Sequence, residues 1–138
     1  MRLLEKITIT GEPPKTTQKN TIKFNRKTGH TYHTKAFNEV RANINKALAE
    51  NKPKTALDGA LGLYITEYFT PPKASKSKRW KNTKPDGDNS IAVIADQLEK
   101  TGHVVNDSRF AVEHIEKRYD KDNPRTEILI YELQEQGE

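Results

Sequence analysis

Residues 84–108 read KPDGDNSIAVIADQLEKTGHVVNDS, and this stretch decides the fold more than any other part of the chain. Its apolar residues recur at steps of three and four positions, with polar residues between them. They are Ile91, Ile94, Ala95 and Leu98. This period predicts an amphipathic helix, for which Asp88 or Asn89 offers the N-cap and Gly102 the end.

Outward from this helix, hydrophobic periodicity predicts a second helix and several strands. The predicted elements are a strand over 3–10, short extended pieces over 21–24 and 31–33, a helix over 35–51, a strand over 61–69, and an antiparallel hairpin of strands 110–119 and 126–133. This order indicates an α+β fold with a small mixed sheet and two main helices. A length of 138 residues suits a single domain over 1–138 and leaves no room for a second core.

Composition excludes several classes of function. The chain has no cysteine, which excludes disulfides, thiolate zinc sites, iron–sulfur clusters and cysteine nucleophiles, and suits a reducing, cytoplasmic setting. No run approaches the about 20 apolar residues of a membrane helix, and Arg2, Glu5 and Lys6 interrupt any signal-peptide core. Hydrophobic residues make up 33%, which predicts a thin core. We therefore expect a cytoplasmic protein that does not enter a membrane.

Positive charge is concentrated in two parts of the chain. The first basic segment, 13–35, and the second basic segment, 73–84, each hold six Lys and Arg residues and no acid. The net charge is +5, so the rest of the chain, which holds all 19 acids, is net negative. Such segregation suits a polyanion such as nucleic acid, whereas a single solvated basic loop would only keep the protein soluble.

Carboxylates mark both ends of the quoted stretch. Asp86 and Asp88 precede the helix, and a return strand after the helix can bring Asp107 back beside its start. Mg²⁺ takes oxygen ligands, usually one or two carboxylates with water and substrate phosphate. An EF-hand is excluded, because its loop needs glycine where this chain has Ile91 and glutamate where it has Gln97. From these residues alone, a metal site and a capped helix beside a solvated turn both remain open.

Four short motifs are spread over most of the chain. They are ITGEPPK at 9–15, PDGDN at 85–89, IADQL at 94–98 and VVNDS at 104–108. The last three resemble the Pro-Asp-Leu-Asp-Asn motif, the helix with an Asp-x-Leu step and the Asp-Asp-Ser motif of RusA-type Holliday-junction resolvases. The first looks like the Gly-x-Pro-x-x-Lys start of that family.

The resemblance implies a small RusA-like α+β homodimer that cuts four-way DNA junctions with Mg²⁺, for which Mn²⁺ substitutes. Carried onto matching positions, the catalytic and metal-binding aspartates are Asp86, Asp88 and Asp107. Branched DNA is then the partner, and bases of the two basic segments bind its phosphates. These bases are Lys15, Lys19, Lys73, Lys76, Lys78, Arg79, Lys81 and Lys84.

Three positions need comment against the family pattern. Family members usually carry a lysine four residues after the second aspartate, where this chain has Ala92, so Lys84 or a base of the second basic segment has to supply that cation. Asn106 replaces the first of the paired aspartates, and we expect it to lie behind the metal ligands. We expect Asp96 to pair with nearby bases rather than to bind metal.

Two other classes of function remain as alternatives to a nuclease. A non-catalytic DNA- or RNA-binding module would need only the basic segments, with the aspartates capping a helix. A small interaction protein would use the polar, acidic tail at 134–138. Trp80, which lies among bases, is expected either to stack on DNA or to pack against a partner chain.

Overall fold

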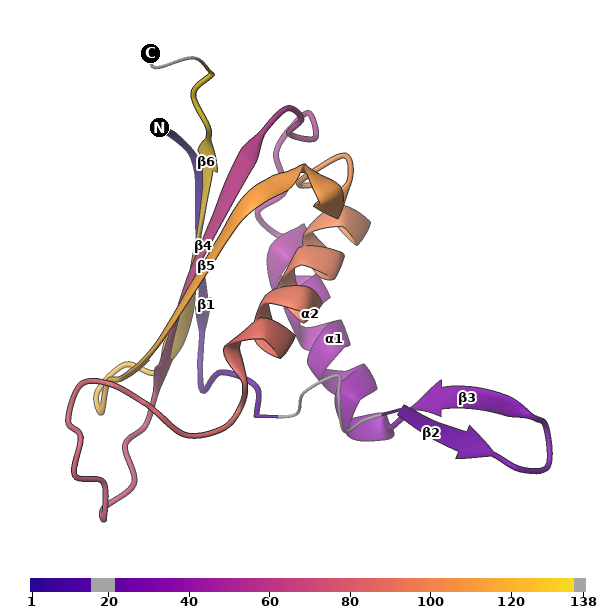
Figure 1. Ribbon diagram of the computed structural model, residues 1–138, viewed down its shortest axis with the longest axis vertical. Helices are drawn as coiled ribbons and strands as arrows, with labels where there is room; N and C mark the ends of the chain where they lie inside the picture. Colours follow the sequence, from indigo (N-terminus) through magenta and orange to yellow (C-terminus); the bar gives the residue numbers. More distant parts are fainter. Residues whose placement is uncertain (16–21, 136–138) are drawn as a thin grey trace.

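A four-stranded sheet forms one layer of the protein, and two helices form the other (Figure 1). The computed structural model describes residues 1–15 and 22–135. Its elements, in chain order, are β1 (Arg2–Thr10), β2 (Ile22–Asn25), β3 (His30–His33), α1 (Lys35–Ala49), β4 (Leu61–Phe69), α2 (Gly87–Lys100), a 3₁₀ turn (Asp107–Arg109), β5 (Phe110–Tyr119) and β6 (Arg125–Glu132). No helix in these ranges is long and apolar enough to cross a membrane. The predicted α+β fold with a mixed sheet and two helices is confirmed.

The strand order in the sheet is β1-β6-β4-β5. β6 runs antiparallel to both β1 and β4, whereas β5 runs parallel to β4. The predicted hairpin of the last two strands is therefore wrong, because β4 lies between them. Burial explains the order: β6 buries Thr126, Ile128 and Ile130 as an inner strand does, while the first half of β5 is largely exposed, as suits an edge.

The core lies between the sheet and the helices. Its buried side chains include Phe37, Ile44 and Leu48 of α1, Ile91, Ile94 and Leu98 of α2, and Leu61, Leu63 and Ile65 of β4. Steps of three and four residues in the helices, and of two in the strand, turn one side of each element inward. Full burial of each such side chain contributes about 1.5–3 kcal/mol, so this layer is what holds the helices on the sheet.

The helices start at different kinds of cap. The Thr34 side chain caps α1 by accepting a 3.3 Å hydrogen bond from the Phe37 N–H. α2 has Asp86 as its N-cap residue, rather than the predicted Asp88 or Asn89, and the Asp86 side chain makes no capping bond. Gly87, the first helical residue, has no side chain, which lets the first turn lie directly against β5.

A buried histidine holds the turn that follows α2. His103 is inaccessible to solvent, with Nδ1 2.7 Å from Oε2 of Glu5 and Nε2 2.7 Å from the carbonyl oxygen of Leu48. Gly102 has a φ of +84°, so the chain reverses there without strain from a Cβ atom. The end of α2 is thereby tied to β1 and α1.

Candidate active site

Asp86 and Asp88 lie together at the exposed start of α2. Asp86 has extended backbone, with φ −70° and ψ 134°, and Asp88 belongs to the first helical turn. Both side chains are exposed, and no described residue forms an ion pair or a side-chain hydrogen bond with either carboxylate. Two exposed carboxylates that no described side chain pairs with can take a hard cation.

Gly87 sets how closely this acidic turn approaches the sheet. A Cβ atom at Gly87 would lie 2.8 Å from Cγ2 of Ile115, a distance that real Cβ contacts do not reach. The start of α2 therefore lies against β5 in a way that a larger residue would prevent. Gly87 therefore fixes the position of the aspartates on either side of it.

Asp107 lies near the other end of α2 from Asp86 and Asp88. Its N–H donates a 2.9 Å hydrogen bond to Oε1 of Glu99, near the C-terminal end of α2. Among residues 1–15 and 22–135, no group of three His, Asp or Glu side chains is placed to hold a metal ion. The expectation that the return strand brings Asp107 beside the helix start is therefore wrong for a single chain. The turn after α2 places Asp107 before β5 begins, and the later residues of β5 run back to the helix start.

A buried glutamate lies beneath the acidic turn. Glu67 of β4 is 1% exposed, and burial raises its pKa to about 7, against the opposing effects of the Ser90 hydroxyl and the Lys117 charge. Lys117 of β5 donates from Nζ to the carbonyl oxygens of Thr83, at 2.6 Å, and Pro85, at 2.9 Å. Sequence reasoning missed this cluster, although Glu67 is the only charged residue in β4.

The second basic segment is attached to the sheet next to the acidic turn. The Lys81 N–H donates to the Lys117 carbonyl oxygen, and the Tyr119 N–H donates to the Arg79 carbonyl oxygen, both at 2.9 Å. Trp80 is 46% exposed, and the Arg118 guanidinium lies 4.5 Å from its ring centre. These bonds extend the edge of β5 and bring the basic segment up to the aspartates.

The predicted phosphate-binding bases of this segment differ in accessibility. Lys81 is half-buried, and its Nζ lies 5.0 Å from the ring centre of Phe69 and 2.9 Å from Oγ1 of Thr83. The ammonium group of Lys81 is therefore engaged in contacts within the protein. The remaining five bases are exposed. They are Lys73, Lys76, Lys78, Arg79 and Lys84.

A comparison with known families identifies the family of the chain. A family model described as endodeoxyribonuclease RusA matches residues 12–131, which include both acidic motifs and the second basic segment. The chain belongs to the RusA family. RusA membership implies nuclease activity of the Holliday-junction resolvase kind. No curated protein matches the chain.

Three residues near the RusA motifs have separate roles. Asp96 forms an ion pair with Lys100 at 3.1 Å, which confirms the expected pairing with a base. The Asn106 side chain accepts a 2.8 Å hydrogen bond from the Ser108 N–H and so caps the 3₁₀ turn. Ala92, where the sequence resemblance predicts a lysine, is exposed on α2.

The first basic segment of this RusA protein includes the β2–β3 hairpin, which extends away from both layers (Figure 1). Phe24 and Tyr32 are 59% and 52% exposed on it, and its turn carries Arg26 and Lys27. Lys15 is exposed before the hairpin, whereas Lys19 lies outside the described residues.

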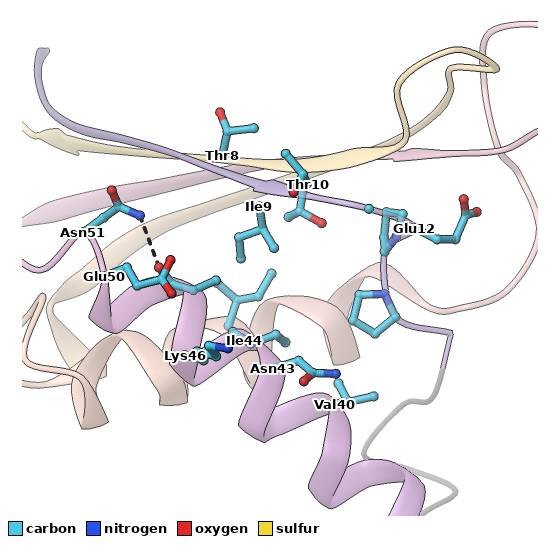
Figure 2. Close-up of a pocket in the computed structure, with 16 residues that line it drawn as sticks. Thr8, Ile9, Thr10, Glu12, Val40, Asn43, Ile44, Lys46, Glu50 and Asn51 are labelled. Carbon is cyan, nitrogen blue, oxygen red and sulfur yellow. Dashed lines mark hydrogen bonds between the residues drawn. The ribbon is translucent and has the colours of Figure 1, made fainter.

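A hollow of about 590 Å³ lies between the end of β1 and α1 (Figure 2). Thr8, Thr10, Asn43 and Glu50 are among the residues that line it. None of the predicted site residues that the structure describes belongs to its lining. The predicted site residues that the structure describes therefore lie outside this cavity.

Proposed function

We propose that this chain is a Mg²⁺-dependent endonuclease that resolves four-way DNA junctions by hydrolysing phosphodiester bonds. The observation that carries the proposal is the pair of unpaired, exposed carboxylates of Asp86 and Asp88 beside an exposed basic segment. Their oxygen donors fit Mg²⁺, and Mn²⁺ is expected to substitute. RusA-family membership supports the same reaction.

Each group near the start of α2 has a separate proposed task. Asp86 and Asp88 hold the metal ion, which when bound supplies an activated water and stabilises the leaving oxygen. The positive end of the α2 dipole favours a phosphate nearby. Lys84, exposed two residues before Asp86, reaches the scissile phosphate in place of the lysine missing at Ala92. The exposed bases of the second basic segment hold the DNA arms without reading sequence.

A second copy of the chain is the proposed source of the third ligand, Asp107. The surface near Asp107 suits a protein partner, because Val105 and Val112 are 45% and 38% exposed. β5 is an edge strand, and residues 79–81 extend only its second half. Within the described residues, the first half of this edge has no strand partner, so it can pair with the same strand of another copy.

An antiparallel pairing over the free first half of β5 directs the partner's Asp107, which precedes its own β5, toward the second half of this strand, where Lys117 lies. Lys117 contacts the carbonyl oxygen of Pro85, directly before Asp86. A two-fold dimer therefore presents two composite sites to a junction that is itself nearly two-fold.

Mixing two inactive variants tests the composite site. Asp88→Asn and Asp107→Asn are each expected to lose nicking, and a mixture of the two is expected to regain it, because one site of each mixed dimer receives both wild-type carboxylates. A mixture that stays inactive would place both aspartates in one chain and overturn the composite site. An active Asp107→Asn variant would remove that residue from the site. Light scattering measures whether the protein is a dimer.

The separation of Asp107 from the other aspartates also favours the alternative, a non-catalytic DNA- or RNA-binding module. A synthetic four-way junction distinguishes the two functions. The nuclease is expected to make paired nicks with Mg²⁺ and none with EDTA. Retention of the junction in a gel without nicking, in both Mg²⁺ and Mn²⁺, would instead support the binding module.

A further inference from the structure

Glu67 and Lys117 are neighbours on parallel strands, directly beneath the start of α2. They are register partners in β4 and β5. Glu67 is 1% exposed, and its Oε1 has no hydrogen-bond partner among the described residues. Burying the Glu67 carboxyl group in the core costs solvation, and an apolar residue of similar size would fill the same space at least as well. The cluster therefore calls for an explanation other than stability.

The polar contacts of this cluster converge on the acidic turn. Lys117 Nζ donates hydrogen bonds to the carbonyl oxygens of Thr83 and Pro85, the residues on either side of Lys84. Both precede Asp86. The Ser90 hydroxyl, two residues after Asp88, lies close enough to the Glu67 carboxylate to lower its pKa. The backbone on both sides of the Asp86–Asp88 pair is thus tied to the sheet through Glu67 and Lys117.

We propose that Glu67, Lys117 and Ser90 are positioning residues that hold Asp86 and Asp88 in the arrangement that binds metal. The proposal rests on the proposed function, because it concerns the affinity of the same site. None of the three residues needs to touch the metal ion. Loss of such outer contacts typically costs about 10- to 100-fold in metal affinity or activity.

Lys117→Met is the decisive variant, because electrostatics and positioning predict opposite results. Removing a positive charge near two carboxylates should by itself strengthen cation binding. Releasing the carbonyl oxygens of Thr83 and Pro85 should weaken it. We expect the dissociation constant for Mn²⁺, measured on the full chain by the EPR signal of free Mn²⁺, to rise about 10- to 100-fold. Single-turnover nicking of a four-way junction should fall at low Mn²⁺ and recover partly at high Mn²⁺.

Three further variants separate positioning from general stability. Glu67→Gln should weaken Mn²⁺ binding as Lys117→Met does, and Ser90→Ala should do so by a smaller factor. Glu5→Gln is the matched control, because it breaks the buried pair with His103 far from the acidic turn. It should lower the melting temperature and leave the Mn²⁺ affinity unchanged. Junction affinity in EDTA should be the same in all four variants.

The outcomes distinguish the two proposals. Wild-type Mn²⁺ affinity and nicking in folded Lys117→Met and Glu67→Gln would overturn the positioning role and leave the proposed function intact. A wild-type protein that neither binds Mn²⁺ nor nicks junctions would overturn the proposed function itself. Should Lys117→Met fail to fold by circular dichroism, Ser90→Ala decides, since it removes only one hydroxyl. Unchanged Mn²⁺ affinity in Ser90→Ala would then count against positioning.

Discussion

The N–H of Asp107 donates a hydrogen bond to Glu99 near the end of the same helix that follows Asp86. α2 has 14 residues, and a rise of about 1.5 Å per residue places its ends about 20 Å apart. The two acidic motifs thus lie at opposite ends of one rigid element. No side-chain rotation within a single chain closes that distance, so Asp107 needs a test of its own, separate from that of Asp86 and Asp88.

Asp86→Asn and Asp88→Asn should each abolish nicking while junction binding persists or strengthens. Each substitution removes a metal-binding charge and also reduces repulsion of DNA phosphates. The loss of rate should exceed the about 10- to 100-fold typical of an outer contact, and single-turnover assays measure it. Asp96→Asn, on the same helix but paired with Lys100, is the control and should cut normally. Loss of junction binding in both folded variants would contradict the metal site.

Local periodicity was sufficient to predict the helices and most strands. In α1, Phe37, Ile44 and Leu48 are buried at helical spacing, and the alternation of β4 likewise matches its burial. Strand pairing was not predictable in this way, because a period of two shows which side of a strand is buried and not which strand lies beside it. The position of β6 between β1 and β4 follows from long-range register alone.

The candidate site was predictable only in part for the same reason. Asp86 and Asp88 are neighbours in sequence, so their proximity needed no tertiary information. The position of Asp107 depends on how the chain turns at Gly102 and where β5 begins. The partnership of Glu67 and Lys117 joins two strands across fifty residues of sequence, and the only local signal was one charge in an otherwise uncharged strand.

Gly87→Ala should destabilise the protein, because its Cβ would meet the Cγ2 methyl of Ile115 at 2.8 Å. Overpacking of this kind typically costs about 1–3 kcal/mol in the free energy of unfolding. Ile115→Ala removes that methyl, so the glycine substitution should cost less in an Ile115→Ala background. Urea unfolding of the four proteins of this cycle measures the coupling. Strictly additive effects would show that Gly87 does not control the approach of α2 to β5.

Glu67 should make stability depend on pH. Its pKa of about 7 in the folded protein lies above its ordinary value of 4.5, so between these values the folded state binds more protons than the unfolded state. The free energy of unfolding should therefore fall as pH rises from 4.5 to about 7, by about 3 kcal/mol from this group. Glu67→Gln should lack this component. Urea unfolding in EDTA across the window measures the difference, and parallel profiles for the two proteins would contradict it.

Lys84 and the other exposed bases should differ in the step that they affect. Replacing Lys73, Lys76, Lys78 and Arg79 with glutamine should weaken binding to any junction sequence and flatten its salt dependence, because fewer counterions are released. Nicking at saturating enzyme should then recover, since these bases only hold the DNA.

Lys84→Gln should lower the single-turnover rate even at saturation, because its charge stabilises the phosphate in the transition state. Ala92→Lys in the Lys84→Gln background should restore part of that rate if both positions serve one phosphate. Both residues are exposed near the start of α2, so neither change disturbs the core. If Lys84→Gln cuts at the wild-type rate once saturated, another residue has to supply the cation that the resemblance predicts at position 92. The exposed Arg79, beside Trp80, is then the next residue to substitute.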